Sequence, residues 1–128
     1  MSYQLRVLVI DDNRDTLLIL ERLVRGLNCE VRTCLDSKKA VEIAQEFWPH
    51  VIFLDISMPG LDGYEVAEDL HDLNMPNYML IALTGHGDEA HRHECEVSGF
   101  DRFLAKPASI DQITSVVESA TAKFLTQV

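Results

Sequence analysis

Short apolar runs alternate along the chain with stretches whose apolar residues recur every three or four positions, and this alternation limits the folds available to it. The five runs cover residues 5–10, 29–34, 51–54, 79–83 and 103–105. The first, third and fourth are apolar at successive positions, which is typical of parallel strands buried on both faces. The second alternates with Glu30 and Arg32 and predicts an edge strand. Together they predict an α/β fold with a parallel sheet and right-handed crossovers.

The stretches between and after the runs predict five helices. Four of them show one apolar face each, and the residues that mark these faces are Leu17, Leu20, Leu23, Val24 and Leu27; Ala40, Ile43, Ala44 and Phe47; Val66, Leu70 and Leu73; and Ile110, Ile113, Val117, Ala120 and Phe124. Two helix starts resemble capping boxes, Asp62 with Glu65 and Ser109 with Gln112. The fourth helix, at roughly residues 88–98, has few apolar residues, so we expect it to be weakly anchored.

The composition bounds the class of protein. A length of 128 residues suits one domain, which needs neither disulfides nor a structural metal to fold. The net charge of −10 argues against binding to a nucleic-acid backbone, which requires clustered Lys and Arg. Three cysteines, an odd number without a CxxC pair, suit a reducing compartment. Because neither a leader sequence nor a membrane-length apolar run is evident, we expect a cytoplasmic domain without membrane insertion.

Polar side chains follow four of the predicted strands. Asp11 and Asp12 come after the first strand, Asp55 after the third, Thr84 after the fourth and Lys106 after the fifth. In open parallel sheets, ligands bind beyond the carboxyl ends of the strands, where these positions converge. The sequence therefore predicts three carboxylates, one hydroxyl and one ammonium at a single edge of the sheet.

These groups suit phosphoryl chemistry. Three neighbouring carboxylates repel one another unless cations lie among them, and Lys106 together with a divalent ion can offset their charge. Mg²⁺ prefers oxygen ligands and is commonly shared with a phosphate. A carboxylate beside Mg²⁺ and an ammonium can attack phosphorus and form an aspartyl phosphate. Lys106 and Thr84 can then stabilise the phosphoryl oxygens.

Each residue also has a plain structural interpretation when it is taken alone. Asp12 or Asn13 can cap the first helix, and Thr84 and Lys106 can be ordinary loop residues. Their joint occurrence at four strand ends favours the functional interpretation.

A second polar group contains His86, His91, His93 and Cys95. His91 and His93, two positions apart on a helix, point to different sides and cannot share a metal, whereas His91 and Cys95 could. A solvated helix face is the favoured interpretation of this group.

Four motifs resemble the receiver domain of bacterial response regulators. They are Val-Leu-Val-Ile-Asp-Asp-Asn at residues 7–13, Leu-Asp-Ile-Ser-Met-Pro-Gly-Leu-Asp-Gly at 54–63, Ala-Leu-Thr-Gly at 82–85, and Gly-Phe-Asp-Arg-Phe-Leu-Ala-Lys-Pro at 99–107. The resemblance covers essentially the whole chain. It implies a flavodoxin-like, doubly wound sheet of five parallel strands in the order 2-1-3-4-5 with five helices, forming a single receiver domain over residues 1–128 with its core at about residues 5–125.

The resemblance also implies a role for each site residue. Asp55 is expected to accept the phosphoryl group and to bind Mg²⁺ (or Mn²⁺) with Asp12, while Asp11 acts on the metal through water. The backbone carbonyl of Ser57 is expected to be a further metal ligand. The phosphoryl oxygens are expected to contact Thr84 and Lys106.

Further residues are implied to tune this pocket and to switch. Ser57, Gly85 and His86 are expected to influence the pocket and the lifetime of the phosphate. Thr84 and Phe103 are expected to form the switch, and the Lys106–Pro107 peptide bond is expected to be cis.

The implied function is a phosphoryl-accepting switch rather than an enzyme. A sensor histidine kinase or phosphotransfer protein is expected to dock near the first helix. The downstream target is unknown, and it is expected to bind the fourth helix, fifth strand and fifth helix. A stand-alone regulator and a part of a hybrid histidine kinase both remain open. An aspartate-nucleophile phosphatase of the haloacid dehalogenase type is disfavoured, because it needs a second acid where this chain has Ser57.

Overall fold

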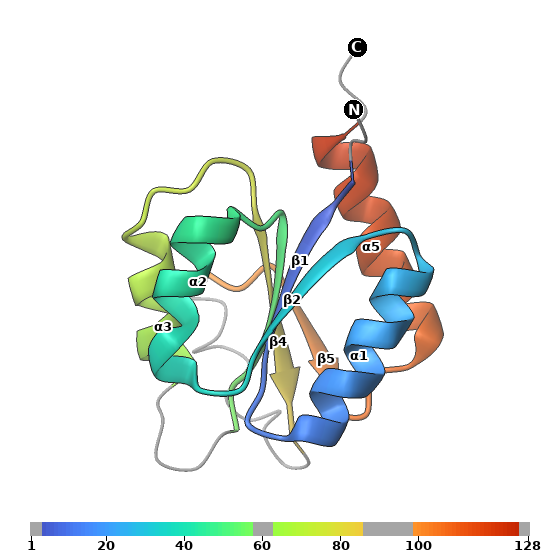
Figure 1. Cartoon of the computed structure of the whole chain (residues 1–128), viewed down its shortest axis with the longest axis horizontal. Coiled ribbons are helices and arrows are strands. Elements are labelled where there is room, and N and C mark those ends of the chain that lie inside the picture. The colour runs from blue at the N-terminus through green and yellow to red at the C-terminus, as the bar shows by residue number, and fades with distance from the viewer. Residues whose placement is uncertain (1–3, 58–62, 86–98, 126–128) are drawn as a thin grey trace.

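Five parallel strands form one sheet (Figure 1), and they run in the order β2-β1-β3-β4-β5. The computed structural model describes residues 4–57, 63–85 and 99–125. The strands are β1 (Arg6–Ile10), β2 (Glu30–Cys34), β3 (Val51–Asp55), β4 (Met79–Thr84) and β5 (Arg102–Ala105). The predicted strand order and the edge position of β2 are confirmed. Asp55 and Thr84 were expected just past their strands and are instead the last residues of β3 and β4.

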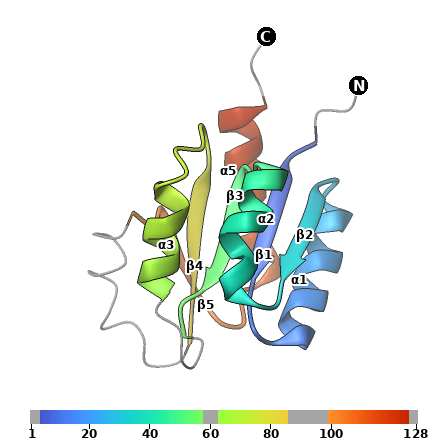
Figure 2. The same ribbon diagram turned by 60° about the vertical axis from the view of Figure 1, so that its left-hand side comes forward.

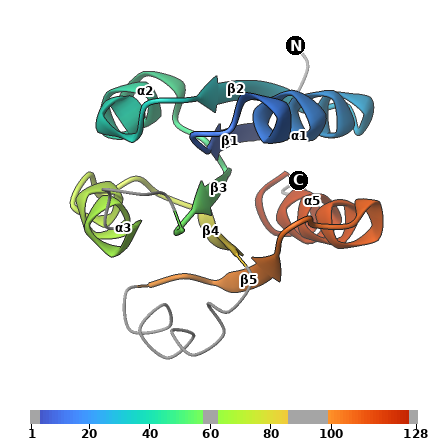
Figure 3. The ribbon, with the colours of Figure 1, turned by 90° about the horizontal axis from the view of Figure 1, so that it is seen from below.

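Helices cover both faces of the sheet, as the view in Figure 3 shows. One face carries α1 (Arg14–Gly26) and α5 (Ile110–Phe124), and the other carries α2 (Ala40–Phe47) and α3 (Gly63–His71). A short 3₁₀ helix, η1 (Ser37–Lys39), leads into α2. The predicted fourth helix and the Asp62 capping residue lie outside the described residues. None of the described helices has the length and apolar composition needed to cross a bilayer.

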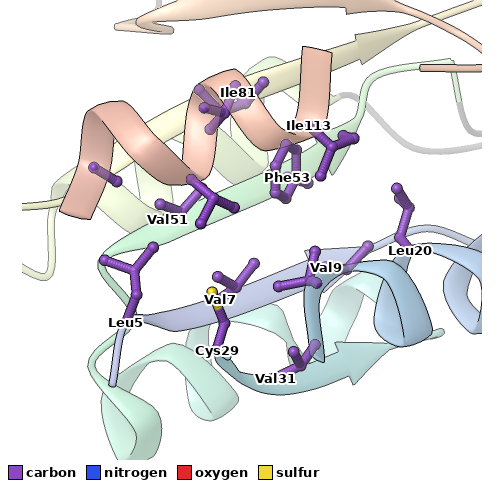
Figure 4. Close-up of a cluster of buried hydrophobic side chains, with 14 of the residues drawn as sticks. Leu5, Val7, Val9, Leu20, Cys29, Val31, Val51, Phe53, Ile81 and Ile113 are labelled. Carbon is purple, nitrogen blue, oxygen red and sulfur yellow. The ribbon is translucent and has the colours of Figure 1, made fainter. Parts of the chain in front are cut away.

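Alternate strand residues face two separate cores, because successive side chains of a strand point to opposite faces of the sheet. On the side of α1 and α5, Phe53 of β3 lies beside Ile113 of α5, and both are fully buried (Figure 4). On the side of α2 and α3, Leu54 packs in the same cluster as Leu70. Each such side chain contributes about 2 kcal/mol through burial, so the two cores hold the sheet firmly.

The starts of α1 and α5 follow the sequence signals, whereas one expected apolar contact of α5 is not found. The Asn13 side chain caps α1, which resolves the choice between Asp12 and Asn13. Ser109 and Gln112 form the predicted capping box at the start of α5. Ile110, which was placed on the apolar face of α5, is 66% exposed. That expectation was wrong because Ile110 is the first residue of the helix, where the chain turns at the surface.

The carboxyl ends of the parallel strands lie along the lower edge of the sheet in Figures 1 and 2. The helices flank this edge without covering the strand ends in the view from below (Figure 3). The fold therefore brings the residues at the ends of β1, β3, β4 and β5 together.

Candidate functional site

Backbone hydrogen bonds beyond the strand ends fix the positions of the site residues. The amide of Asp11 donates to the carbonyl of Cys34 over 3.1 Å, which extends the pairing of β1 with β2 by one residue. The amide of Lys106 donates to the carbonyl of Thr84 over 2.8 Å, which extends the pairing of β5 with β4. Asp55 ends β3 between these pairs. The side chains thus start from a rigid frame.

Lys106 lies between two buried carboxylates. Its Nζ is 2.8 Å from Oδ2 of Asp11 and 3.0 Å from Oδ2 of Asp55. Asp11 and Asp55 are 0% and 2% exposed. Burial alone would lower the pKa of Lys106, but the two carboxylates raise it above its usual value. Lys106 therefore remains an ammonium at neutral pH.

Asp55 accepts hydrogen bonds at both carboxylate oxygens. Oδ1 accepts one bond from the Ser57 amide at 2.9 Å and one from the Ser57 hydroxyl at 2.8 Å. Oδ2 accepts from Lys106. Burial raises the pKa of Asp55, but the bonds from Ser57 and Lys106 together with the lysine charge outweigh it and lower the pKa below its usual value. Asp55 is consequently an ionised, potentially nucleophilic carboxylate.

Asp11 has the opposite electrostatic balance. Its Oδ1 accepts from the Asn13 amide at 3.0 Å. Its Oδ2 is buried and accepts no well-directed hydrogen bond from the described residues, so its short contact with Lys106 is ionic. Burial raises the pKa of Asp11, and the charge of Asp55 adds to this, while Lys106 and Asn13 offset it only in part. The folded protein therefore disfavours the charged form of Asp11 relative to water.

The site residues fit a divalent metal. Asp11, Asp12 and Asp55 each offer a carboxylate oxygen, and these atoms lie within 4.8 Å of one another. Three carboxylates and one ammonium leave two negative charges (three minus one) in a small volume. An all-oxygen set with net negative charge, in which Asp12 is exposed to solvent, suits a hard cation that keeps several waters.

The two expected switch residues lie on the neighbouring strands β4 and β5. Thr84 is 8% exposed, and its hydroxyl donates a long 3.4 Å bond to the carbonyl of Leu104. Phe103 is half-buried and packs against the core on the side of α2 and α3. Gly85 is half-buried, whereas His86 and the group with His91, His93 and Cys95 lie outside the described residues.

The turn after β5 contributes to a hollow beside the site. The Lys106–Pro107 peptide bond is cis, as expected. Next to it lies a hollow of about 250 Å³ whose lining includes Ile19, Leu83 and Pro107. Ile19 is 62% exposed, and its neighbour Leu18 is 46% exposed.

Sequence reasoning missed two features of this region. The exposed pair Leu18 and Ile19 had a signal, because four successive apolar residues at 17–20 exceed what one helix face can bury. The hydroxyl contact of Ser57 with Asp55 had none, because which atom a serine hydroxyl meets depends on its rotamer.

Comparisons with known proteins agree on one family. The family model described as "Response regulator receiver domain" matches residues 7–118. The response regulator PleD of Caulobacter vibrioides is 34% identical over 120 residues, which are 91% of this chain and 26% of that protein. The chain thus spans about a quarter of the length of this curated relative.

Solved structures share the fold over nearly the whole chain. The receiver domain of the Francisella response regulator 1452 has a TM-score of 0.82 at 27% identity, covering 94% of this chain and 98% of that one. A response regulator receiver domain protein from Clostridium thermocellum has a TM-score of 0.84 at 27% identity, covering 96% and 99%. The chemotaxis protein CheY4 of Vibrio cholerae has a TM-score of 0.84 at 21% identity, covering 92% and 99%, and this likeness shows the fold alone.

Proposed function

Because this chain belongs to the response regulator receiver domain family, we propose that Asp55 is the residue that accepts the phosphoryl group. The family consists of phosphoryl-accepting switches of two-component systems rather than enzymes in the usual sense. One observation carries the assignment: Asp55 is an ionised carboxylate at the end of a central strand, held by Lys106 and adjoining the acidic pair.

In the proposed reaction, a carboxylate oxygen of Asp55 attacks the phosphorus of a phosphohistidine. The new oxygen–phosphorus bond forms as the phosphorus–nitrogen bond breaks, and the electron pair of the broken bond returns to the imidazole of the donor. Lys106 already lies 3.0 Å from Asp55 and can neutralise charge on the transferring oxygens. The Thr84 hydroxyl can donate to one of those oxygens once it leaves the Leu104 carbonyl.

A divalent metal belongs to this proposal. We assign Mg²⁺, or Mn²⁺ in its place, to Asp12 and Asp55 as direct ligands, with Asp11 acting through water and the Ser57 carbonyl as a further ligand. The clustering of three carboxylates supports this assignment. When bound, such a metal supplies positive charge to the phosphoryl oxygens. Gly85 and His86 are assigned to the tuning of the pocket, together with Ser57.

The donor in this proposal is a sensor histidine kinase or a phosphotransfer protein. We assign its docking to the exposed side of α1, because Leu18 and Ile19 are exposed apolar residues beside the hollow at Lys106. Ile19→Asp should slow transfer from the donor protein at least tenfold and leave labelling by acetyl phosphate unchanged. Equal slowing of both reactions would contradict this docking site.

The remaining assignments concern extent and output. We propose that residues 1–128 form one receiver domain with its core at about residues 5–125, acting in the cytoplasm where ATP-dependent kinases supply the phosphoryl group. The phosphorylated form is proposed to present a changed surface on the fourth helix, β5 and α5 to a target. The position of Phe103 on β5, half-buried and one residue before the carbonyl that binds Thr84, supports this route.

The test of the phosphoacceptor is intact-protein mass spectrometry after incubation with acetyl phosphate and Mg²⁺. The wild type should gain one phosphoryl group, and Asp55→Asn should gain none. Asp101→Asn is a matched control, because it removes a carboxylate that bonds a backbone amide away from the site. Equal labelling of Asp55→Asn and wild type would refute the assignment.

A further inference from the structure

The Ser57 hydroxyl donates a hydrogen bond to Oδ1 of Asp55, whereas Lys106 contacts the other oxygen, Oδ2. A carboxylate oxygen has two lone pairs, and Oδ1 of Asp55 already accepts two hydrogen bonds. One comes from the Ser57 amide at 2.9 Å and the other from the Ser57 hydroxyl at 2.8 Å. Oδ1 is therefore saturated in this state.

The other oxygen of Asp55 is poorly placed for a metal ion. Oδ2 lies 3.0 Å from the Lys106 ammonium, which also lies 2.8 Å from Oδ2 of Asp11. A dication on that side would be repelled by the ammonium at short range. The electrostatics thus direct a metal to Oδ1, which is the oxygen that the Ser57 hydroxyl occupies.

We propose that the Ser57 hydroxyl competes with the divalent metal for Oδ1 of Asp55, so that metal binding requires this hydroxyl to turn away. The inference rests on the proposed function and adds a regulatory step to the same site. Ser57 is exposed, so water can satisfy the released hydroxyl at little cost. Its amide belongs to the backbone and can keep its bond to Asp55. Ser57 acts through Asp55 and is a positioning residue.

The Ser57 hydroxyl helps to fix the orientation of the Asp55 carboxylate when no metal is present. Two donors from Ser57 and one from Lys106 hold the carboxylate at three points. When the metal replaces the hydroxyl, the amide and Lys106 still hold the carboxylate. The hydroxyl therefore raises the metal concentration that half-fills the site, because each metal bound must displace one charge-assisted hydrogen bond.

The test is titration of metal-free protein with MgCl₂ alone, followed by calorimetry or by amide NMR shifts. Ser57→Ala removes the hydroxyl and keeps both the amide and the backbone carbonyl. It should bind Mg²⁺ about fivefold more tightly than the wild type, which corresponds to the net contribution of one hydrogen bond. Ser57→Thr keeps a hydroxyl donor and should bind within about twofold of the wild type, as rescue by a conservative change requires.

Two controls separate the possible outcomes. Ser119→Ala removes a serine hydroxyl that bonds Arg102 at the start of β5, and it should leave Mg²⁺ binding unchanged. Equal or weaker Mg²⁺ binding by Ser57→Ala, or no saturable binding by any variant, would overturn the competition. Labelling of Asp55 by acetyl phosphate is measured on the same proteins. If labelling persists while the affinities are equal, the inference fails and the proposed phosphoacceptor stands.

Discussion

The two ends of the sheet differ in the contacts of their polar side chains. At the carboxyl end, Lys106 contacts both Asp11 and Asp55, and these two carboxylates also accept from backbone amides. At the amino end, the side chains of Arg6, His50 and Asp101 bind backbone atoms. Asp101 Oδ2 accepts from the Leu80 amide at 2.8 Å.

Arg6 and His50 illustrate the amino end best. Nε of Arg6 donates to the carbonyls of Phe47 and Trp48, at 3.0 Å and 2.8 Å. Nδ1 of His50 accepts from the Arg6 amide at 2.9 Å, and its ring stacks on Phe124 near the end of α5. These side chains complete hydrogen bonds that the strands leave open.

This difference indicates which end of the sheet stabilises the fold and which end lowers its stability. Backbone groups satisfied at the amino end stabilise the native state, because a buried group without a partner is costly. Carboxylates crowded at the carboxyl end lower stability while keeping charge available for a metal and a phosphoryl group. The predictions below test this contrast, from the largest expected effect to the smallest.

Removing the cation should cost the most. Lys106→Met leaves the buried carboxylates of Asp11 and Asp55 without their counter-charge. In metal-free buffer at pH 7 we expect the free energy of unfolding to fall by about 2 kcal/mol, less than for a fully buried pair because the lysine side chain is 24% exposed. Urea denaturation measures this. Lys123→Met, which removes a cation next to Phe124, should change stability by less than about 0.5 kcal/mol. Similar losses of stability in Lys106→Met and Lys123→Met would show that the carboxyl end of the sheet does not depend on the Lys106 charge.

Two aspartates at opposite ends should respond with opposite signs. The raised pKa of Asp11 means that its charged form is disfavoured in the folded state, so its contribution to stability is lost as pH rises through that pKa. Asp11→Asn imitates the protonated form and should add about 1 kcal/mol at pH 7 without metal. Asp101→Ala should instead remove about 1 kcal/mol, because the Leu80 amide loses its acceptor.

Thermal and urea unfolding of these two variants provide the measurement. Mg²⁺ should stabilise the wild type more than Asp11→Asn, so that with Mg²⁺ the wild type becomes the more stable of these two proteins. A loss of stability in both variants without metal would show that the carboxyl end is not strained by its charges.

His50 should make the amino end sensitive to acid. Burial and the charge of Arg6 lower the pKa of His50 from 6.5, so the folded state favours the neutral ring. Its contribution is therefore present above pH 6.5 and is lost as pH falls through the lowered pKa. The loss is at most about 1 kcal/mol, the net contribution of the bond from the Arg6 amide.

His50→Asn keeps an acceptor that does not titrate in this range. Between pH 7 and pH 5, the free energy of unfolding of the wild type should therefore fall relative to that of His50→Asn. Urea denaturation at the two pH values measures this. A difference independent of pH would show that the His50 ring nitrogen does not accept the Arg6 amide.

The sequence could predict which residues meet at the carboxyl end of the sheet, but not how their atoms contact one another. Asp11, Asp55, Thr84 and Lys106 could be brought together because each follows an apolar strand, and parallel strands end at one edge. Which oxygen meets which donor could not be predicted, because it depends on side-chain rotamers. The bond between the Ser57 hydroxyl and Oδ1 of Asp55 is such a detail.

The side-chain contacts at the amino end of the sheet were not predicted from the sequence. His50 lies opposite Arg6 only because β1 and β3 pair in a register that aligns Val7 with Val51. A ring nitrogen that accepts a backbone amide across two strands leaves no local pattern in the sequence. Periodicity predicted the helix faces well, yet it misplaced Ile110, because a periodic pattern does not record where a helix begins.

The last prediction concerns Thr84, which contributes little stability and is assigned to the switch. Its hydroxyl donates to the Leu104 carbonyl over 3.4 Å, a long and therefore weak bond. That bond contributes only about 0.5 kcal/mol of stability, so Thr84→Ala should lose little beyond the burial of one methyl group. Phosphorylation of Asp55 is expected to draw the hydroxyl away from β5. The space it vacates would then let the neighbouring Phe103 ring move inward.

The phosphate can bias this two-state element only by as much as it interacts differently with the two states. Thr84→Ala should therefore still be labelled at Asp55 while losing the response at Phe103. Fluorine NMR of a labelled Phe103 measures that response, before and after acetyl phosphate and Mg²⁺ are added. Thr84→Ser keeps the hydroxyl and should retain the shift. If the shift is unchanged in Thr84→Ala, the coupling between Asp55 and β5 runs through a route other than the Thr84 hydroxyl.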